Sequence, residues 1–145
     1  MKTLHFQSVF VGGCGTAAGP MEAQGPLKDK IDKLFDDIYC EEKTYEQAER
    51  RLMSEACDHA LRAQGCKTSD LDLILGGDLL NQLGTSHYFA RDLEIPFIGL
   101  YGACSNSTLI AANAAMWIDS GHAERVLGLT SSHNATAERQ FRYPN

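Results

Sequence analysis

The sequence predicts an α/β fold in which helices flank a mainly parallel sheet. Strand-like and helix-like segments alternate along the chain to about residue 132, an order that favours right-handed crossovers between parallel strands. The strand-like segments are short apolar runs ended by glycine or polar residues, as expected for strands buried on both faces. Because ligands gather at the carboxyl ends of parallel strands, the residues that follow each strand are the candidates for function.

Composition places the chain among ordinary globular proteins with one domain. The 145 residues are 43% hydrophobic and carry a formal net charge of -6, with no lysine or arginine cluster, so we expect no nucleic-acid partner. No segment approaches the ~20 apolar residues of a membrane helix. The five cysteines are irregularly spaced, which favours free thiols in a reducing compartment and no metal site.

The first part of the chain predicts one strand and one short helix. Residues 4–13 (LHFQSVFVGG) alternate loosely between apolar and polar and end in glycines, which favours a first strand over a signal peptide. Residues 13–43 then form an elaborated connection of the kind that often covers a site. Within it, residues 27–39 predict a helical patch with one apolar face, formed by Leu27, Ile31, Leu34 and Ile38.

The best-signalled element is a helix that begins after Thr44. Thr44 and Gln47 have the spacing of a capping box, and Gly65 supplies a stop signal. The helix is therefore expected between Thr44 and Gly65. The face expected to be buried is formed by Ala48, Leu52, Ala56, Ala60 and Ala63.

The rest of the chain predicts three further strands separated by helices. Residues 71–77 (LDLILGG), 96–103 (PFIGLYGA) and 125–132 (RVLGLTSS) are predicted to be strands. Residues 78–95 are predicted to be helical over part of their length and to stop before a proline. Residues 105–121 predict a helix rich in small residues that ends in glycine.

These three strands end in polar or reactive side chains that should meet at one edge of the sheet. Asp78 follows the first strand, Cys104 the second and His133 the third. Cys104 also precedes a helix, whose unpaired N-terminal amides would stabilise a thiolate or hold a carboxylate ligand. A small structural cysteine is the alternative for this position, and an ordinary N-cap is the alternative for Asp78.

A catalytic thiol at Cys104 would need a base. His133 and His87 are the candidates, and a hydrogen-bonded structural role is the alternative for His133. Arg139 and Arg142 lie in the polar C-terminal segment. Through bidentate contacts they could close over an anion, or they could remain solvated.

Several stretches together resemble the stage V sporulation protein AD family of spore-forming bacteria. They are GPMEAQGPL, FDDIYCEEKTYEQAERRLM, GGDLLNQ, IPFIGLYGACSNS and TSSHNATAERQFRYP. The resemblance runs from about residue 11 to the last residue. It implies a thiolase-like fold, related to ketoacyl synthases of the acyl-carrier-protein type. It also implies that the protein binds dipicolinic acid, together with calcium, and supports its uptake into the developing spore without catalysis.

The resemblance also implies partners and a location. Members of the family act with membrane-embedded sporulation proteins of the same operon. The protein is therefore expected in the cytoplasm or peripherally associated with the spore inner membrane. No cofactor is implied apart from calcium that accompanies dipicolinate.

By the same resemblance, Cys104 matches the position of the thiolase nucleophile and is expected to be part of a ligand pocket, no longer a working nucleophile. The residues expected to bind the ligand are Cys104, Asp78, Asn81, His133, Asn134 and Arg142. After the cysteine this chain has SNSTLIAANAAM, where the family usually has STSMEG followed by small residues. This departure is expected to alter the floor of the pocket.

Length is the second departure from the family pattern. The chain supplies about the first half of a thiolase-like fold, so we expect residues 1–145 to form an incomplete N-terminal domain. The histidines or asparagine that thiolases use beside their cysteine belong to the second half. A homo-oligomer or a second polypeptide is expected to cover the exposed face. The alternatives to a binding protein are a thiolase-type or ketoacyl-synthase-type acyltransferase using Cys104, and a fragment that only docks to a partner chain.

Overall fold

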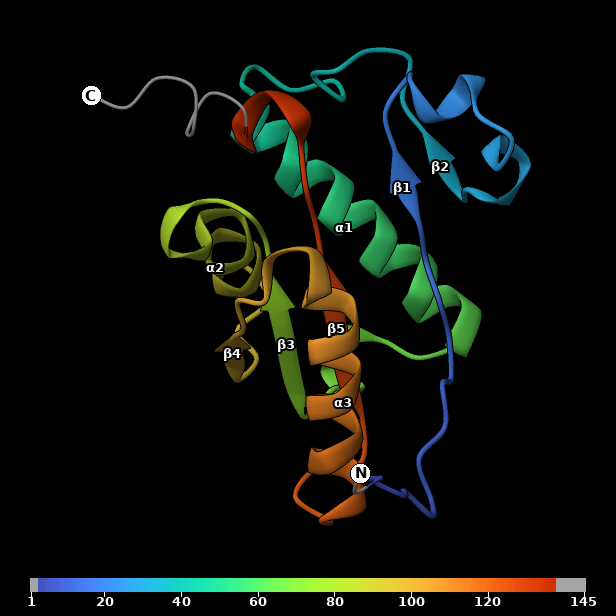
Figure 1. Cartoon of the computed structure of the whole chain (residues 1–145), viewed down its shortest axis with the longest axis vertical. Helices are drawn as coiled ribbons and strands as arrows, with labels where there is room; N and C mark the ends of the chain where they lie inside the picture. Colours follow the sequence, from blue (N-terminus) through green and yellow to red (C-terminus); the bar gives the residue numbers. More distant parts are fainter. Residues whose placement is uncertain (1–2, 138–145) are drawn as a thin grey trace.

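The computed structural model describes residues 3–137 and has a parallel sheet between two layers of helices (Figure 1). Its helices and strands are β1 Ala17–Ala18, β2 Lys33–Leu34, α1 Tyr45–Gln64, β3 Leu73–Gly77, α2 Gly84–Arg91, β4 Phe97–Gly99, α3 Asn106–Asp119 and β5 Val126–Thr130. The main sheet has the order β4-β3-β5, and both outer strands run parallel to β3. A separate parallel pair is formed by β1 and β2. The predicted α/β class is confirmed.

The two faces of the main sheet are covered by different helices. On one face, Ile74, Leu127 and Leu129 pack with side chains of α1 and α2. On the other face, Leu73 and Leu75 pack against α3. Side chains alternate between the faces of a strand, so a strand covered on both faces must be apolar throughout. This explains why every residue of β3 is buried.

Asp72 aligns the start of β5 with β3. Its Oδ2 atom accepts hydrogen bonds from the backbone N–H groups of Glu124, at 2.7 Å, and Arg125, at 2.9 Å. The bonds from Arg125 and Glu124 hold the pKa of the Asp72 carboxyl below its usual value. The Asp72 side chain thereby fixes the point at which the connection through α3 returns to the sheet as β5.

Helix α1 begins and ends where the sequence predicts. The Thr44 hydroxyl oxygen accepts a hydrogen bond from the Gln47 N–H at 3.3 Å, and Gly65 ends the helix in the left-handed region with φ 71°. The second bond of the predicted capping box differs. The Gln47 side chain accepts from the N–H of Lys43, which precedes the cap residue.

The buried face of α1 differs from the predicted alanine face, of which only Ala48 is fully buried. The other residues that α1 buries are Glu49, Met53, Cys57 and Leu61. The backbone of Ala56 and Ala60 instead lies against Gly13 and Gly15 of the N-terminal segment. The large side chains of α1 therefore face the sheet, and its small ones admit a second backbone to close contact.

The first strand predicted over residues 4–13 is wrong. These residues form no strand in the described structure, and the side chains of Phe10 and Val11 are each 84% exposed. The first pairing occurs later, where Ala17–Ala18 pairs with Lys33–Leu34. A strand needs a second backbone beside it to satisfy its N–H and C=O groups. The apolar alternation therefore indicates a segment able to pair without showing its partner.

The helical patch predicted over residues 27–39 is also wrong. A short 3₁₀ turn at Lys28–Lys30 is followed directly by β2. The Asp32 carboxylate accepts the N–H and the hydroxyl of Thr16, both at 2.8 Å, and these bonds lower the pKa of Asp32. A short amphipathic pattern makes only a marginal helix, so pairing with a distant segment prevails.

The later elements lie close to their predicted places. The predicted helix over residues 105–121 is α3, and Gly121 follows it with φ 74°. Strand β4 is shorter and less buried than its apolar sequence suggests, because it lies at an edge of the sheet. Within residues 3–137, no helix has both the length and the apolar character needed to cross a bilayer.

Candidate functional site

The loops after β3, β4 and β5 lie at one edge of the main sheet because the three strands are parallel. They carry Asp78, Cys104 and His133. The structure divides this set of predicted residues between the two helical layers. Asp78 and His133 lie close enough to Glu49 of α1 to affect the pKa of its carboxyl group. Cys104 directly precedes α3, the helix that covers the opposite face.

Asp78 is fully buried and organises the turn from β3 into α2. Its Oδ2 atom accepts the N–H of Ser86 at 2.7 Å and the Ser86 hydroxyl at 2.6 Å. Its Oδ1 atom accepts the N–H of Leu80 at 2.9 Å. These bonds give Asp78 a capping role in the first turn of α2. Contact between Asp78 and a ligand stays a prediction.

Asn81 is exposed in the turn that Asp78 organises. The two residues after it, Gln82 and Leu83, have positive φ angles of 60° and 56°. Such angles are costly for residues other than glycine and persist only where surrounding contacts impose them. The turn therefore presents Asn81 in a defined backbone conformation.

His133 caps a helical turn formed by residues 134–137. Its Nδ1 atom accepts the N–H of Ala135 at 3.2 Å. The other ring nitrogen, Nε2, therefore carries the proton and donates to the carbonyl oxygen of Ile38 at 2.7 Å. The ring also stacks on Tyr45, with centroids 5.4 Å apart. Both ring nitrogens of His133 are thus engaged within the protein.

Two further predicted site residues, Asn134 and Arg142, add little to the geometry of the described site. Asn134 is exposed at the start of the helical turn. Arg142, and Arg139 with it, lies outside the described residues. Their contact with an anion stays a prediction.

Cys104 is exposed in a 3₁₀ turn, Ala103–Ser105, directly before α3. Ala103 has a φ angle of 47°, a strained conformation of the kind that clusters at functional sites. Asn106 holds the turn, since its Oδ1 atom accepts the N–H of Gly102. Asn106 is 2% exposed, and its Nδ2 atom has no hydrogen-bond partner within residues 3–137.

Glu49 is a buried acid at this edge that sequence reasoning missed. It is 1% exposed, and its two carboxylate oxygens accept the hydroxyls of Ser131, at 2.9 Å, and Thr136, at 2.7 Å. It therefore joins α1 to the segment after β5. A signal in the sequence is that Glu49 lies on the same face of the predicted helix as the apolar Met53 and Cys57, since the three residues are spaced four apart.

Burial raises the pKa of Glu49 because it penalises the charged carboxylate. The hydroxyls of Thr136 and Ser131 oppose this effect by bonding to the carboxylate, and the nearby charge of Asp78 adds to it. A carboxyl whose pKa is raised on folding contributes most stability below its usual pKa and loses that contribution as pH rises through the raised value.

We therefore expect Glu49→Gln, which cannot ionise, to gain stability relative to the unmodified chain as the pH rises above the usual pKa of a glutamate, about 4.3. Urea denaturation at several pH values measures the difference in free energy of unfolding. The same change at the exposed Glu22 is the control. A difference that stays constant with pH, or that changes in the opposite direction, would contradict the assignment.

The five cysteines differ in exposure, and Cys66 is intermediate. Cys14 and Cys104 are exposed, and Cys40 and Cys57 are buried. Burial raises the pKa of each of these two buried thiols to about 11. Their thiols are therefore protonated at neutral pH, the unreactive form of cysteine. In the described part of the chain, no group of three His, Cys, Asp or Glu side chains could hold a metal ion.

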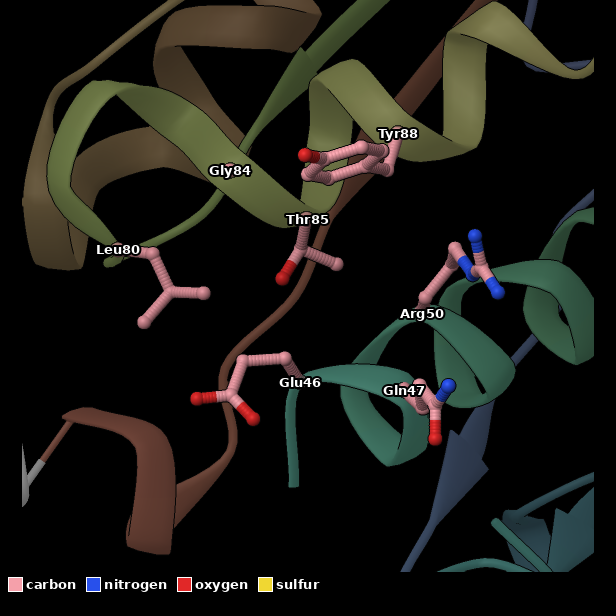
Figure 2. A pocket seen from close by; sticks show the side chains of 7 residues that line it. All are labelled: Glu46, Gln47, Arg50, Leu80, Gly84, Thr85 and Tyr88. Carbon is pink, nitrogen blue, oxygen red and sulfur yellow. The ribbon is translucent and has the colours of Figure 1, made fainter. Parts of the chain in front are cut away.

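A cavity of about 280 Å³ lies between α1 and α2 (Figure 2). Figure 2 shows the Thr85 side chain extending from α2 toward the side of α1 that carries Glu46. The Thr85 hydroxyl is buried and has no hydrogen-bond partner within the described residues. The residues that line the cavity are Glu46, Gln47, Arg50, Leu80, Gly84, Thr85 and Tyr88. None of the predicted site residues is among them.

Comparison with known proteins decides the family. The family model described as stage V sporulation protein AD matches residues 1–145. The chain belongs to this family. Stage V sporulation protein AD of Bacillus subtilis (strain 168) is 52% identical to it over 136 residues, which are 94% of this chain and 40% of that protein. The chain therefore spans well under half the length of this relative.

Two solved structures show the fold. One is 3-oxoacyl-[acyl-carrier-protein] synthase III from Aquifex aeolicus VF5, with a TM-score of 0.56 and 24% identity over 66% of this chain and 32% of that one. The other is the synthase III from Xanthomonas oryzae pv. oryzae, with a TM-score of 0.52 and 15% identity over 81% of this chain and 41% of that one. The chain thus has part of a thiolase-like fold, as the family resemblance implies.

Proposed function

We propose that this chain is the dipicolinate-binding part of a sporulation protein and that it binds its ligand without catalysis. Membership of the stage V sporulation protein AD family supports the role in sporulation. The observation that carries the proposal is the setting of Cys104. The thiol is exposed on a strained turn at the start of a helix, but no base is hydrogen-bonded to it within residues 3–137.

The two candidate bases of this chain contact other groups than the Cys104 thiol. A nucleophilic thiol is normally activated by a neighbouring base within hydrogen-bond reach. His133 directs its ring nitrogens to Ala135 and Ile38. The His87 ring instead packs edge-on against Phe97, at a centroid distance of 5.1 Å. Neither histidine is therefore hydrogen-bonded to the Cys104 thiol within residues 3–137.

The chemistry of dipicolinate suits the edge near Cys104. The ligand carries two carboxylates on a flat aromatic ring, and the free amides at the start of a helix favour a carboxylate. Helix α3 has 14 residues and offers such amides directly after Cys104. Asp78, Asn81, His133 and Asn134 belong to loops at the same edge, and Arg142 is proposed to bind the second carboxylate.

The proposal reaches beyond this chain in two respects. Calcium is proposed to enter with dipicolinate, which itself supplies carboxylate ligands. Uptake into the spore, with membrane-embedded partners, is proposed for the whole protein, of which this chain represents 40% of the length of the Bacillus subtilis relative. Residues 1–145 are proposed to be one N-terminal domain of that protein.

Calorimetric titration with dipicolinic acid, with and without calcium, tests the proposal once circular dichroism shows a folded chain. We expect saturable binding that Cys104→Ala weakens about tenfold, which corresponds to about 1.4 kcal/mol. Cys14→Ala, at the other exposed cysteine, is the matched control. Arg50→Ala removes the cation from the cavity between α1 and α2 and should leave the affinity unchanged.

Each contrary result has a distinct meaning. Unchanged affinity in Cys104→Ala would remove Cys104 from the pocket, and weaker binding in Arg50→Ala would move the ligand to the cavity in Figure 2. Mass spectrometry after incubation with acyl-coenzyme A would detect an acyl group on Cys104, which would support the acyltransferase alternative. A folded chain that does neither would be a docking fragment.

A further inference from the structure

The cavity between α1 and α2 holds a buried hydroxyl group that the described part of the chain leaves without a hydrogen bond. We call this space, of about 280 Å³, the α1–α2 cavity. Thr85 lines it and is only 3% exposed, and its hydroxyl has no hydrogen-bond partner within residues 3–137. Buried polar atoms are nearly always bonded, because an unbonded one has lost its water without compensation. The Thr85 hydroxyl is therefore a candidate contact for a ligand.

The backbone before α2 explains why Thr85 differs from other helical hydroxyls. Ser54 of α1 and Thr108 of α3 each donate to a backbone carbonyl about one turn earlier. In the turn before Thr85, Gln82 and Leu83 have positive φ angles, so the chain there is not helical. The Thr85 hydroxyl therefore has no carbonyl at the position that a helix would supply. It thus remains able to bond to a molecule in the cavity.

The wall of the cavity opposite Thr85 carries two opposite charges. Glu46 and Arg50 are four residues apart on α1, so they lie on one face about 6 Å apart along the helix axis. Figure 2 shows both of them on α1, across the cavity from Thr85 and Tyr88 of α2. A molecule in the cavity would therefore meet a negative group, a positive group and a hydroxyl.

Both charged groups are able to bind a ligand beside the contacts they already make. The Arg50 guanidinium lies 3.7 Å from the Asp92 carboxylate, and the two side chains are 34% and 52% exposed. Ion pairs exposed to this extent contribute little, and a guanidinium has five N–H donors to share. A carboxylate such as that of Glu46 accepts several hydrogen bonds through its two oxygens. Arg50 can therefore hold a carboxylate of the ligand, and Glu46 can hold an ammonium group.

The remaining lining limits the size and the polarity of the ligand. Leu80 and the ring of Tyr88 are apolar, and Gly84 adds no side chain. Pockets for drug-sized molecules have volumes of about 300–1,000 Å³. At about 280 Å³, the α1–α2 cavity fits a smaller molecule that has an apolar part beside its charged groups.

We propose that the α1–α2 cavity binds a small amino acid with an apolar side chain, in its zwitterionic form. The ammonium group donates to the Glu46 carboxylate and to the Thr85 hydroxyl oxygen, and the carboxylate pairs with Arg50. The side chain of the ligand contacts Leu80 and Tyr88. This site shares no residue with the one proposed for dipicolinate, so the proposal does not depend on the proposed function.

Ligands with a single charge fit the cavity less well. A simple carboxylate would face Glu46 without an ammonium group between them, and a simple amine would face Arg50 in the same way. An uncharged apolar molecule would leave the Thr85 hydroxyl without a hydrogen bond. A zwitterion offers a partner to all three groups.

Calorimetric titration of the folded chain with L-leucine tests the proposal. Two analogues each lack one charge: 4-methylpentanoate lacks the ammonium group, and 3-methylbutylamine lacks the carboxylate. We expect saturable binding of L-leucine and at least about tenfold weaker binding of both analogues. Cys104→Ala should leave the affinity for L-leucine unchanged, which separates this site from the one proposed for dipicolinate.

Substitutions at Thr85 and Arg50 test whether the ligand lies in the cavity. Thr85→Val replaces the hydroxyl by a methyl group and should weaken the binding of L-leucine at least about tenfold. Because it also removes an unbonded buried hydroxyl, it should raise the urea midpoint of the free chain. Thr85→Ser keeps the hydroxyl and should keep the affinity.

Arg50→Gln should weaken the binding of L-leucine at least about tenfold, because it removes the cation that pairs with the carboxylate. Arg62→Gln, at an exposed position of the same helix, is the matched control and should leave the affinity unchanged. Circular dichroism of each variant confirms that the chain is folded.

Three results would overturn the proposal. The first is a folded chain that does not bind L-leucine. The second is equal affinity for L-leucine and either analogue, which would mean that the cavity does not recognise both charges. The third is binding that Cys104→Ala weakens and that Thr85→Val and Arg50→Gln leave unchanged, which would place the amino acid at the edge that carries Cys104. None of these results bears on the titration with dipicolinic acid.

Discussion

Replacing Asp78 by alanine is expected to lower the free energy of unfolding by about 3–4 kcal/mol, because buried acceptors of several hydrogen bonds are among the costliest side chains to remove. Asp78 receives bonds from the backbone and hydroxyl of Ser86 and from the backbone of Leu80. The variant leaves these buried donors without partners. Urea denaturation followed by circular dichroism measures the change.

Two further variants show which bonds matter. Ser86→Ala removes only the hydroxyl donor and should cost about 1 kcal/mol. Asp92→Ala removes an exposed carboxylate whose ion pairs lie at the surface, and it should cost less than about 0.5 kcal/mol. A loss below about 1 kcal/mol in Asp78→Ala would show that the turn into α2 does not depend on this carboxylate.

Replacing Gly15 by alanine is expected to cost about 2–3 kcal/mol, since forced overpacking shifts backbone that cannot rotate away. The new Cβ would lie 2.0 Å from the Ala56 carbonyl oxygen and 2.5 Å from the Ala60 nitrogen, and both are backbone atoms of α1. The strain is relieved if the N-terminal segment leaves the helix. Limited proteolysis should therefore cut the segment before residue 15 faster in the variant.

Gly12→Ala is the matched control for this prediction. Its new Cβ would also meet close atoms, at 2.4 Å, but they belong to the flexible end of the Gln64 side chain. Because that side chain is able to move aside, the stability should change by less than about 1 kcal/mol. Equal effects of the two substitutions would mean that contact with the α1 backbone does not hold the segment in place.

The elements that could be predicted from the sequence are those whose signals are local. The hydroxyl of Thr44 and the left-handed Gly65 act within one turn of the helix they bound, so α1 was predicted closely. Strand β3 was predicted because a parallel strand covered on both faces must be apolar at every position. Helix α3 was predicted from its small and apolar residues and from Gly121.

The failures share a different physical cause. Residues 4–13 have the pattern of a strand, but a strand exists only beside a partner, and none lies next to them in the described structure. Residues 27–39 have the pattern of a helix, but Asp32 bonds to Thr16, which is distant in sequence. Local patterns state what a segment is able to form, and distant contacts decide which form is adopted.

The candidate site shows the same division. The positions of Asp78, Cys104 and His133 at one edge follow from strand order alone, so sequence reasoning could predict them. The bonds of His133 to Ile38 and of Glu49 to Thr136 join residues far apart in the chain, and no local sequence pattern predicts them. Sequence reasoning could therefore predict the location of the edge but could not distinguish residues engaged in the fold from those free for a ligand.

The two buried cysteines allow the rates at which two parts of the protein open to be measured separately. Cys57 belongs to the main core between α1 and the sheet, and Cys40 to a small cluster with Phe35 and Ala48. A thiol reagent reaches either one only after its own cluster opens. Equal labelling rates would mean that the two clusters open in one event. A faster rate at Cys40 would mean that the loop before α1 opens locally while the core between α1 and the sheet stays closed.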